Sequence, residues 1–120
     1  MKRVQPKALA KKIIRAVWDK KAEQIALLNL KKLSGVADYF VICSAGSEMH
    51  AQVIAEAVRE TFRGTDTILH VEGSEHGRWI LVDCLDVVLH IFRPETREYY
   101  ALEKLWGDAP REDYPDDIRP

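Results

Sequence analysis

Residues 79–92 read WILVDCLDVVLHIF and contain two short apolar runs with almost no residues between them. This spacing is typical of an antiparallel hairpin, because a parallel connection needs a crossover of a dozen or more residues. A two-residue loop at Cys84 and Leu85 would place Asp83 opposite Asp86. Alternation along both strands then gives the hairpin one aliphatic face and one mixed face. The aliphatic face predicts a core that is covered by helices.

The mixed face of the hairpin is the candidate surface for a partner. Its residues are Trp79, Leu81, Asp83, Asp86, Val88, His90 and Phe92. Aromatic anchors with a polar rim are typical of protein interfaces. In the alternative, Trp79 and Phe92 pack beneath a C-terminal helix and the two Asp residues lie at a solvated hairpin tip. Spacing alone leaves both interpretations open.

The remainder of the chain alternates helices with short strands. Pro6 fits the first turn of a helix, and Ser47 can cap a second one. The predicted elements are a helix at 6–20, strands at 24–29 and 39–45, a helix at 47–64, strands at 68–72, 79–83 and 86–92, and a helix at 94–106. This α-β-β-α-β-β-β-α order predicts one α/β domain over residues 1–109, with a mixed five-stranded sheet and flanking helices. Residues 110–120 are acidic and rich in proline, which predicts a loose tail.

The formal net charge of −1 conceals a split along the chain. Residues 1–21 hold eight basic residues and one acidic residue, whereas the rest of the chain holds ten basic and eighteen acidic residues. The acidic body is suited to a basic partner. The basic side chains of the first predicted helix are Lys7, Lys11, Lys12 and Arg15. They predict a solvated helix face or, alternatively, a contact with RNA that reads no bases, because no aromatic residues are interleaved with them.

The residues that could carry chemistry form no recognisable catalytic set. Asp83 and Asp86 invite a two-carboxylate metal site, but no Asp-x-Asp or Asp-x-Glu pair follows the Gly46-Ser47 turn on a strand. We therefore interpret both carboxylates as turn residues. The histidines at positions 70, 76 and 90 share no metal-ligand spacing. We expect no catalytic residue, no metal and no cofactor.

The cysteines and the apolar runs indicate a compartment. Cys43 and Cys84 each lie within an apolar stretch, where buried reduced thiols are typical. The apolar stretches are of strand length, far short of the roughly 18–20 residues that span a bilayer. We expect a cytoplasmic protein with no membrane contact.

Several motifs together resemble one known family. They are KKAEQI at 20–25, ADYFVI at 37–42 leading to Gly46-Ser47, WILVD at 79–83, DVVLHIF at 86–92 and LEKLWGDA at 102–109. In this order they resemble the signatures of the ribosomal silencing factor family, also called iojap. The chain departs from the family at Leu85, where members usually have Gly, and this bears on the geometry of the hairpin turn.

The resemblance implies a nucleotidyltransferase-like fold that has lost its catalytic carboxylates. It also implies a non-enzymatic factor that binds the fourteenth protein of the large ribosomal subunit, blocks joining of the small subunit and represses translation during starvation. The expected contact residues are all those of the mixed hairpin face except Phe92, with Tyr99 nearby: Trp79, Leu81, Asp83, Asp86, Val88 and His90. The alternatives are a nucleotidyltransferase-like enzyme and an RNA-binding module that uses the basic first helix. A homodimer away from the ribosome also remains open, because free sheet edges can pair.

Overall fold

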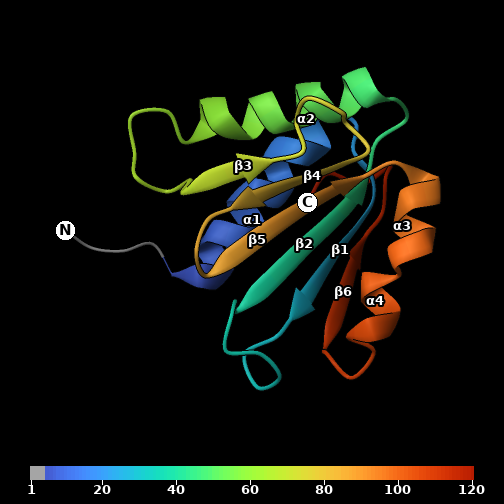
Figure 1. The fold of residues 1–120 in the computed structure, drawn as a ribbon. Helices are drawn as coiled ribbons and strands as arrows, with labels where there is room; N and C mark the ends of the chain where they lie inside the picture. Colours follow the sequence, from blue (N-terminus) through green and yellow to red (C-terminus); the bar gives the residue numbers. More distant parts are fainter. Residues whose placement is uncertain (1–4) are drawn as a thin grey trace.

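The computed structural model describes residues 5–120. Its helices are α1 (Pro6–Asp19), α2 (Glu48–Thr61), α3 (Pro94–Tyr100) and α4 (Leu102–Leu105). Its strands are β1 (Glu23–Asn29), β2 (Tyr39–Ser44), β3 (His70–Glu72), β4 (Trp79–Asp83), β5 (Val87–Phe92) and β6 (Arg111–Tyr114). They form one mixed sheet in the order β3-β4-β5-β2-β1-β6, in which β2 and β5 are parallel and the other neighbours are antiparallel (Figure 1). Within residues 5–120, no helix has both the length and the apolar character needed to cross a membrane.

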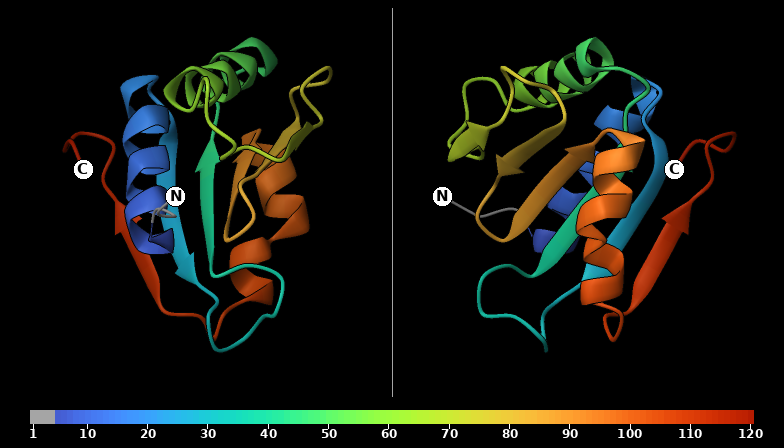
Figure 2. Two further views of the ribbon diagram at one scale, coloured as in Figure 1. Left: turned by 90° about the vertical axis from the view of Figure 1, so that its left-hand side faces the viewer. Right: turned by 45° about the vertical axis from the view of Figure 1, so that its right-hand side comes forward.

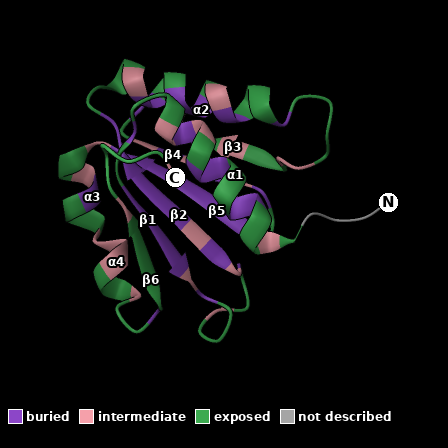
Figure 3. Cartoon of the chain, turned by 180° about the vertical axis from the view of Figure 1, so that it is seen from behind, coloured by how far each residue is buried: buried purple, intermediate pink, exposed green. Residues whose placement is uncertain are grey.

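Helices α1 and α2 cover one face of the sheet. In α1, a proline in the first turn is followed by the buried residues Leu9, Ile13 and Val17, which recur every four residues. The hydroxyl of Ser47 caps α2 by accepting a hydrogen bond from the His50 N–H at 3.0 Å. Figure 3 shows the inward sides of both helices buried and their outward sides exposed. The aliphatic hairpin face lies in this core, as predicted, with Ile80, Val82, Val87, Leu89 and Ile91.

Helices α3 and α4 pack against part of the opposite face, as the right-hand view of Figure 2 shows. The sequence predicted one helix over 94–106, but the structure breaks it at Ala101, whose φ of 47° and ψ of 51° are left-handed. This break redirects the chain so that Leu102 and Trp106 pack beside Phe92 in a second, smaller hydrophobic cluster.

The sheet has six strands, so the expected number of five is wrong. The sixth is β6, which lies in the segment that was predicted to be a loose tail and pairs with the outer edge of β1, from Ile25 opposite Tyr114 to Leu28 opposite Arg111. The Tyr114 side chain packs against the main core. An edge strand joins a sheet mainly through its backbone hydrogen bonds. The charged side chains of β6 therefore did not indicate a strand in the sequence.

The register of the hairpin also differs from the prediction. Trp79 lies opposite Phe92, and Leu81 lies opposite His90. The Cys84 N–H donates to the Val87 carbonyl at 2.9 Å, so the loop residues are Leu85 and Asp86. This shift by two positions along β5 preserves both faces, because side chains alternate with a period of two. It separates Asp83 from Asp86, which no longer face each other.

Candidate partner-binding face

The mixed face of β4 begins beside α3 at Trp79 and extends away from that helix to Asp83. Trp79, Leu81 and Asp83 are alternate residues of this strand, so their side chains share the face on which α3 and α4 pack. All three are half-buried. Four residues of strand span about 13 Å, so the strand joins an aromatic end to an acidic end.

His90 and Val88 lie beneath this face instead of on it. Val88 is 8% exposed and His90 is 3% exposed. The Trp79 indole N–H donates to His90 Nδ1 at 3.1 Å, so the neutral imidazole carries its proton on Nε2. Burial lowers the pKa of His90 to about 4. Val88 and His90 were expected as contact residues, but in the structure their side chains are buried beneath the neighbouring residues of the mixed face.

An aromatic cluster surrounds the His90 imidazole. The Phe40 ring lies edge-on to it with centroids 4.5 Å apart, and the Trp79 ring packs on Phe92 at 4.9 Å. The role of Phe40 in covering His90 could not be predicted from the sequence, because nothing in the sequence indicates that β2 pairs with β5. Parallel pairing of Phe40 with Val88 brings Phe40 onto the same face.

The exposed aromatic surface lies where α3 meets the start of β4. Tyr100 packs on Trp79 with ring centroids 4.6 Å apart, and Tyr99 packs edge-on against Tyr100 at 5.0 Å. Tyr99 is 81% exposed and Tyr100 is 48% exposed. An open groove of about 500 Å³ runs beside them, lined by Gly73, His76, Arg78, Trp79, Glu95, Thr96, Tyr99 and Tyr100. Gly73 has a φ of 82°, and a Cβ there would overlap the Trp79 carbonyl, so only glycine lets this loop approach β4 so closely.

The acidic end of the face is held by local contacts. Asp83 Oδ1 accepts a hydrogen bond from the Leu85 N–H at 2.8 Å, which confirms its interpretation as a turn residue. Its Oδ2 lies 3.6 Å from His70 Nδ1, and His70 Nε2 lies 3.5 Å from Glu72. Asp86 occupies the hairpin loop, where its carbonyl accepts hydrogen bonds from the N–H groups of residues 38 and 39. These acids form a carboxylate rim beside Leu81. We call Trp79, Leu81, Asp83, Asp86, Tyr99 and Tyr100 together the partner face.

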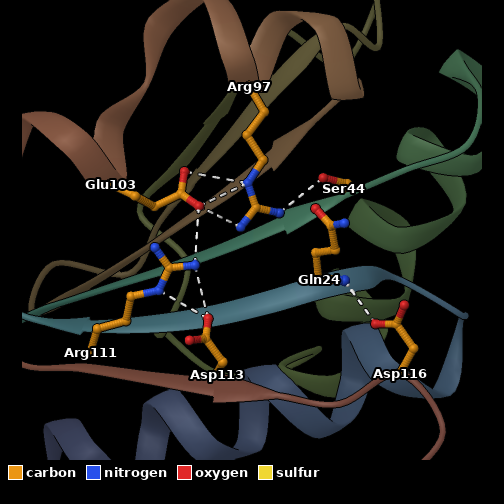
Figure 4. A network of polar contacts seen from close by, with 7 residues as sticks. All are labelled: Gln24, Ser44, Arg97, Glu103, Arg111, Asp113 and Asp116. Atoms are coloured by element: carbon orange, nitrogen blue, oxygen red, sulfur yellow. Dashed lines mark hydrogen bonds and ion pairs between the residues drawn. The ribbon is translucent and has the colours of Figure 1, made fainter.

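A polar network fixes α3 and α4 on the sheet. The guanidinium of Arg97, which is 8% exposed, donates to Glu103 Oε2 at 2.7 Å and to the Ser44 hydroxyl at 2.9 Å. Arg111 of β6 lies 3.6 Å from the same Glu103 carboxylate and 2.9 Å from Asp113 (Figure 4). The network therefore ties both helices to β2 and β6, and this attachment presents Tyr99 on the outer side of α3.

Comparison with known proteins identifies the family. A family model described as "Ribosomal silencing factor during starvation" matches residues 3–120. The chain belongs to this ribosomal silencing factor family. A relative from Halalkalibacterium halodurans, named ribosomal silencing factor RsfS, is 48% identical over 98 residues, which cover 81% of this chain and 84% of that protein.

The fold and a more distant relative agree with this membership. The crystal structure of protein CV0518 from Chromobacterium violaceum has a TM-score of 0.83 and 31% sequence identity, covering 87% of this chain and 88% of that one. A mouse protein named "Mitochondrial assembly of ribosomal large subunit protein 1" is 33% identical over 89 residues, covering 71% of this chain and 39% of that longer protein. Part of the mouse protein, whose name refers to assembly of the large ribosomal subunit, is thus similar in sequence to this chain.

The two cysteines of this silencing-factor chain belong to its core. Cys43 and Cys84 are free thiols and both are buried, as the sequence predicted. Burial raises the pKa of Cys43 to about 12 and that of Cys84 to about 11. Neither thiol is therefore activated as a nucleophile at neutral pH.

Proposed function

We propose that the protein represses translation by binding the fourteenth protein of the large ribosomal subunit through the partner face and blocking attachment of the small subunit. The observation that carries this proposal is the exposed aromatic surface of Tyr99, Tyr100 and Trp79 beside an open groove. Aromatic anchors are enriched among the residues that dominate binding energy at protein interfaces. The membership of a silencing-factor family provides the ribosomal context.

The rim of the partner face supports a basic partner. Glu72, Asp83 and Asp86 lie at one end of the face and Glu95 at the other. Carboxylates at a rim steer a Lys- or Arg-rich surface into place and weaken wrong encounters. Ribosomal proteins carry many such basic residues because they bind RNA. We therefore expect affinity for the partner to fall as salt rises.

The proposed mechanism is steric and needs no reaction. The molecule measures about 37 × 35 × 28 Å. This is large compared with the space between the contacting surfaces of two joined subunits. A body of this size that is bound where the small subunit docks would prevent the two subunits from meeting. We propose that this takes place in the cytoplasm, where subunits join.

The turn between β2 and α2 supports binding without nucleotidyl transfer. We propose that the fold is nucleotidyltransferase-like, with Gly46-Ser47 at the position of the phosphate-holding turn. The Gly46 N–H donates to His50 Nδ1 at 2.9 Å, and the Ser47 hydroxyl caps α2. The other His50 nitrogen donates to the Lys20 carbonyl at 2.7 Å. Both groups that would face a phosphate are thus used inside the protein.

Sedimentation of purified subunits tests the block directly. Small and large subunits are mixed with and without the protein and separated on a sucrose gradient. We expect the peak of joined particles to shrink as the protein is added, with the protein migrating with the large subunit. If joined particles formed equally in both cases, the proposed block would be refuted.

Replacement of Tyr99 tests the partner face. Because Tyr99 is 81% exposed, Tyr99→Ala should leave the fold intact. We expect it to weaken binding to the purified fourteenth protein by more than about 1 kcal/mol, or about fivefold, as loss of an aromatic anchor does. The matched control is Met49→Ala, which removes a 74% exposed side chain from α2 on the other side of the sheet. Equal affinity of wild type and Tyr99→Ala would show that this face is not the interface.

A further inference from the structure

A groove lies between α1 and the edge strand β6, away from the partner face. The left-hand view of Figure 2 shows α1 running alongside β6. The groove has a volume of about 320 Å³. The residues that line it are Lys7, Lys11, Ile14, Arg15, Glu112, Tyr114 and Pro120.

The groove is strongly cationic. Lys7, Lys11 and Arg15 are four residues apart and share one side of α1, so their charges follow one another about every 6 Å along the axis. Lys7 Nζ lies 3.7 Å from Glu112 across the groove, and Glu112 also accepts a hydrogen bond from the Tyr114 hydroxyl at 2.9 Å. Lys11 and Arg15 have no ion-pair partner among residues 5–120. The side chains that line the groove thus include three cations and one carboxylate.

The composition of this surface favours RNA over a protein as the ligand. A protein interface needs an apolar centre, which the partner face has. The α1 groove instead presents flexible cations, with its only large aliphatic side chain, Ile14, buried in the core. Phosphate contacts need cations and no apolar anchor, and they read no bases. A stripe of separated Lys and Arg side chains fits a continuous phosphate backbone.

We propose that the α1–β6 groove binds the phosphate backbone of ribosomal RNA through Lys7, Lys11 and Arg15. The inference rests on the proposed function, which brings the protein to a particle made largely of RNA. The groove opens at the β6 edge of the sheet, away from the β4 and α3 residues of the partner face. A second contact of this kind raises the overall affinity, because it forms within an already tethered complex.

The test compares two charge-matched variants of the full chain. One variant carries Lys7→Gln, Lys11→Gln and Arg15→Gln. The control carries Lys31→Gln, Lys32→Gln and Arg59→Gln, which remove the same charge from exposed sites outside the groove. Binding to large subunits is measured over a range of salt concentrations. Three lost phosphate contacts should make the slope of log affinity against log salt shallower by about 2.7, at about 0.9 per contact, whereas the control should keep the wild-type slope.

Protein-free ribosomal RNA from the large subunit, measured in the same series, identifies the ligand. We expect wild type and control to bind this RNA and the groove variant to bind it more weakly. Equal slopes for groove variant and control would overturn the proposal. A groove-specific loss on subunits, with no groove-specific loss on protein-free RNA, would also overturn it and indicate an acidic protein surface instead. Because Tyr99→Ala is measured separately, failure of the groove leaves the partner face unaffected.

Discussion

Replacing Leu85 by glycine should stabilise this protein, although it removes a side chain. Leu85 is the first residue of the two-residue hairpin loop and has a φ of 70°. A left-handed conformation brings Cβ too close to the backbone, which is why glycine is preferred at such loop positions. The family resemblance places Gly at this point of the turn. The chain therefore carries local strain beside its partner face.

The size of the effect follows from three contributions. The left-handed conformation costs a leucine roughly 1–2 kcal/mol, and glycine removes this cost. Glycine also makes the unfolded chain more flexible, which lowers the free energy of unfolding by roughly 0.5–1 kcal/mol. Leu85 is 50% exposed, so little apolar burial is lost, and its N–H keeps the 2.8 Å bond to Asp83. We expect Leu85→Gly to raise the free energy of unfolding by about 0.5–1 kcal/mol.

Urea denaturation followed by tryptophan fluorescence measures this change. The midpoint should rise while the slope m stays constant, because the surface exposed on unfolding is unchanged. The matched control is Leu33→Gly, at a 42% exposed loop position whose φ is not left-handed. It should lower stability by about 0.5–1 kcal/mol. If Leu85→Gly were as destabilising as Leu33→Gly, the assignment of strain to this turn would be refuted.

Two further predictions concern buried polar groups. The pKa of His90 is about 4 in the folded protein and 6.5 in the unfolded chain, so the unfolded chain binds the proton first as pH falls. The free energy of unfolding should therefore decrease as pH drops from 6.5 toward 4, by about 3 kcal/mol at the limit. His90→Phe should remove this part of the pH dependence, and a wild-type-minus-variant difference that does not change with pH would contradict the prediction. Arg97→Met should cost about 3 kcal/mol in chemical denaturation, because it leaves the Glu103 carboxylate without its closest cation. Arg97→Met with Glu103→Leu should recover most of that loss, and a double variant no more stable than the single one would count against the ion pair.

The sequence was sufficient to predict those elements whose structure is set by a local pattern of residues. The period of α1 and the cap at Ser47 predicted helices within one to three residues of their observed ends. The hairpin faces survived an error of two positions in register, because an even shift keeps each side chain on its side of the sheet. The aliphatic face therefore had to lie under the helices.

The functional surface depended on contacts between distant parts of the chain. The sequence could not separate exposed from buried members of the mixed face, because alternation gives the direction of a side chain but not what covers it. Parallel pairing of β2 with β5 brings Phe40 onto His90, and the Ala101 break carries α4 over Phe92. These contacts bury His90 and Val88 while Tyr99 and Tyr100 stay exposed.

Composition and periodicity were enough to predict the aliphatic core face, the acidic body and the basic first helix. Contacts between distant segments establish which residues of the mixed face reach solvent, and that the acidic C-terminal segment forms a sixth strand beside β1. The physical reason is that side-chain periodicity is set by the local backbone. Strand order and the covering of a sheet face are set by pairings between residues far apart in the chain.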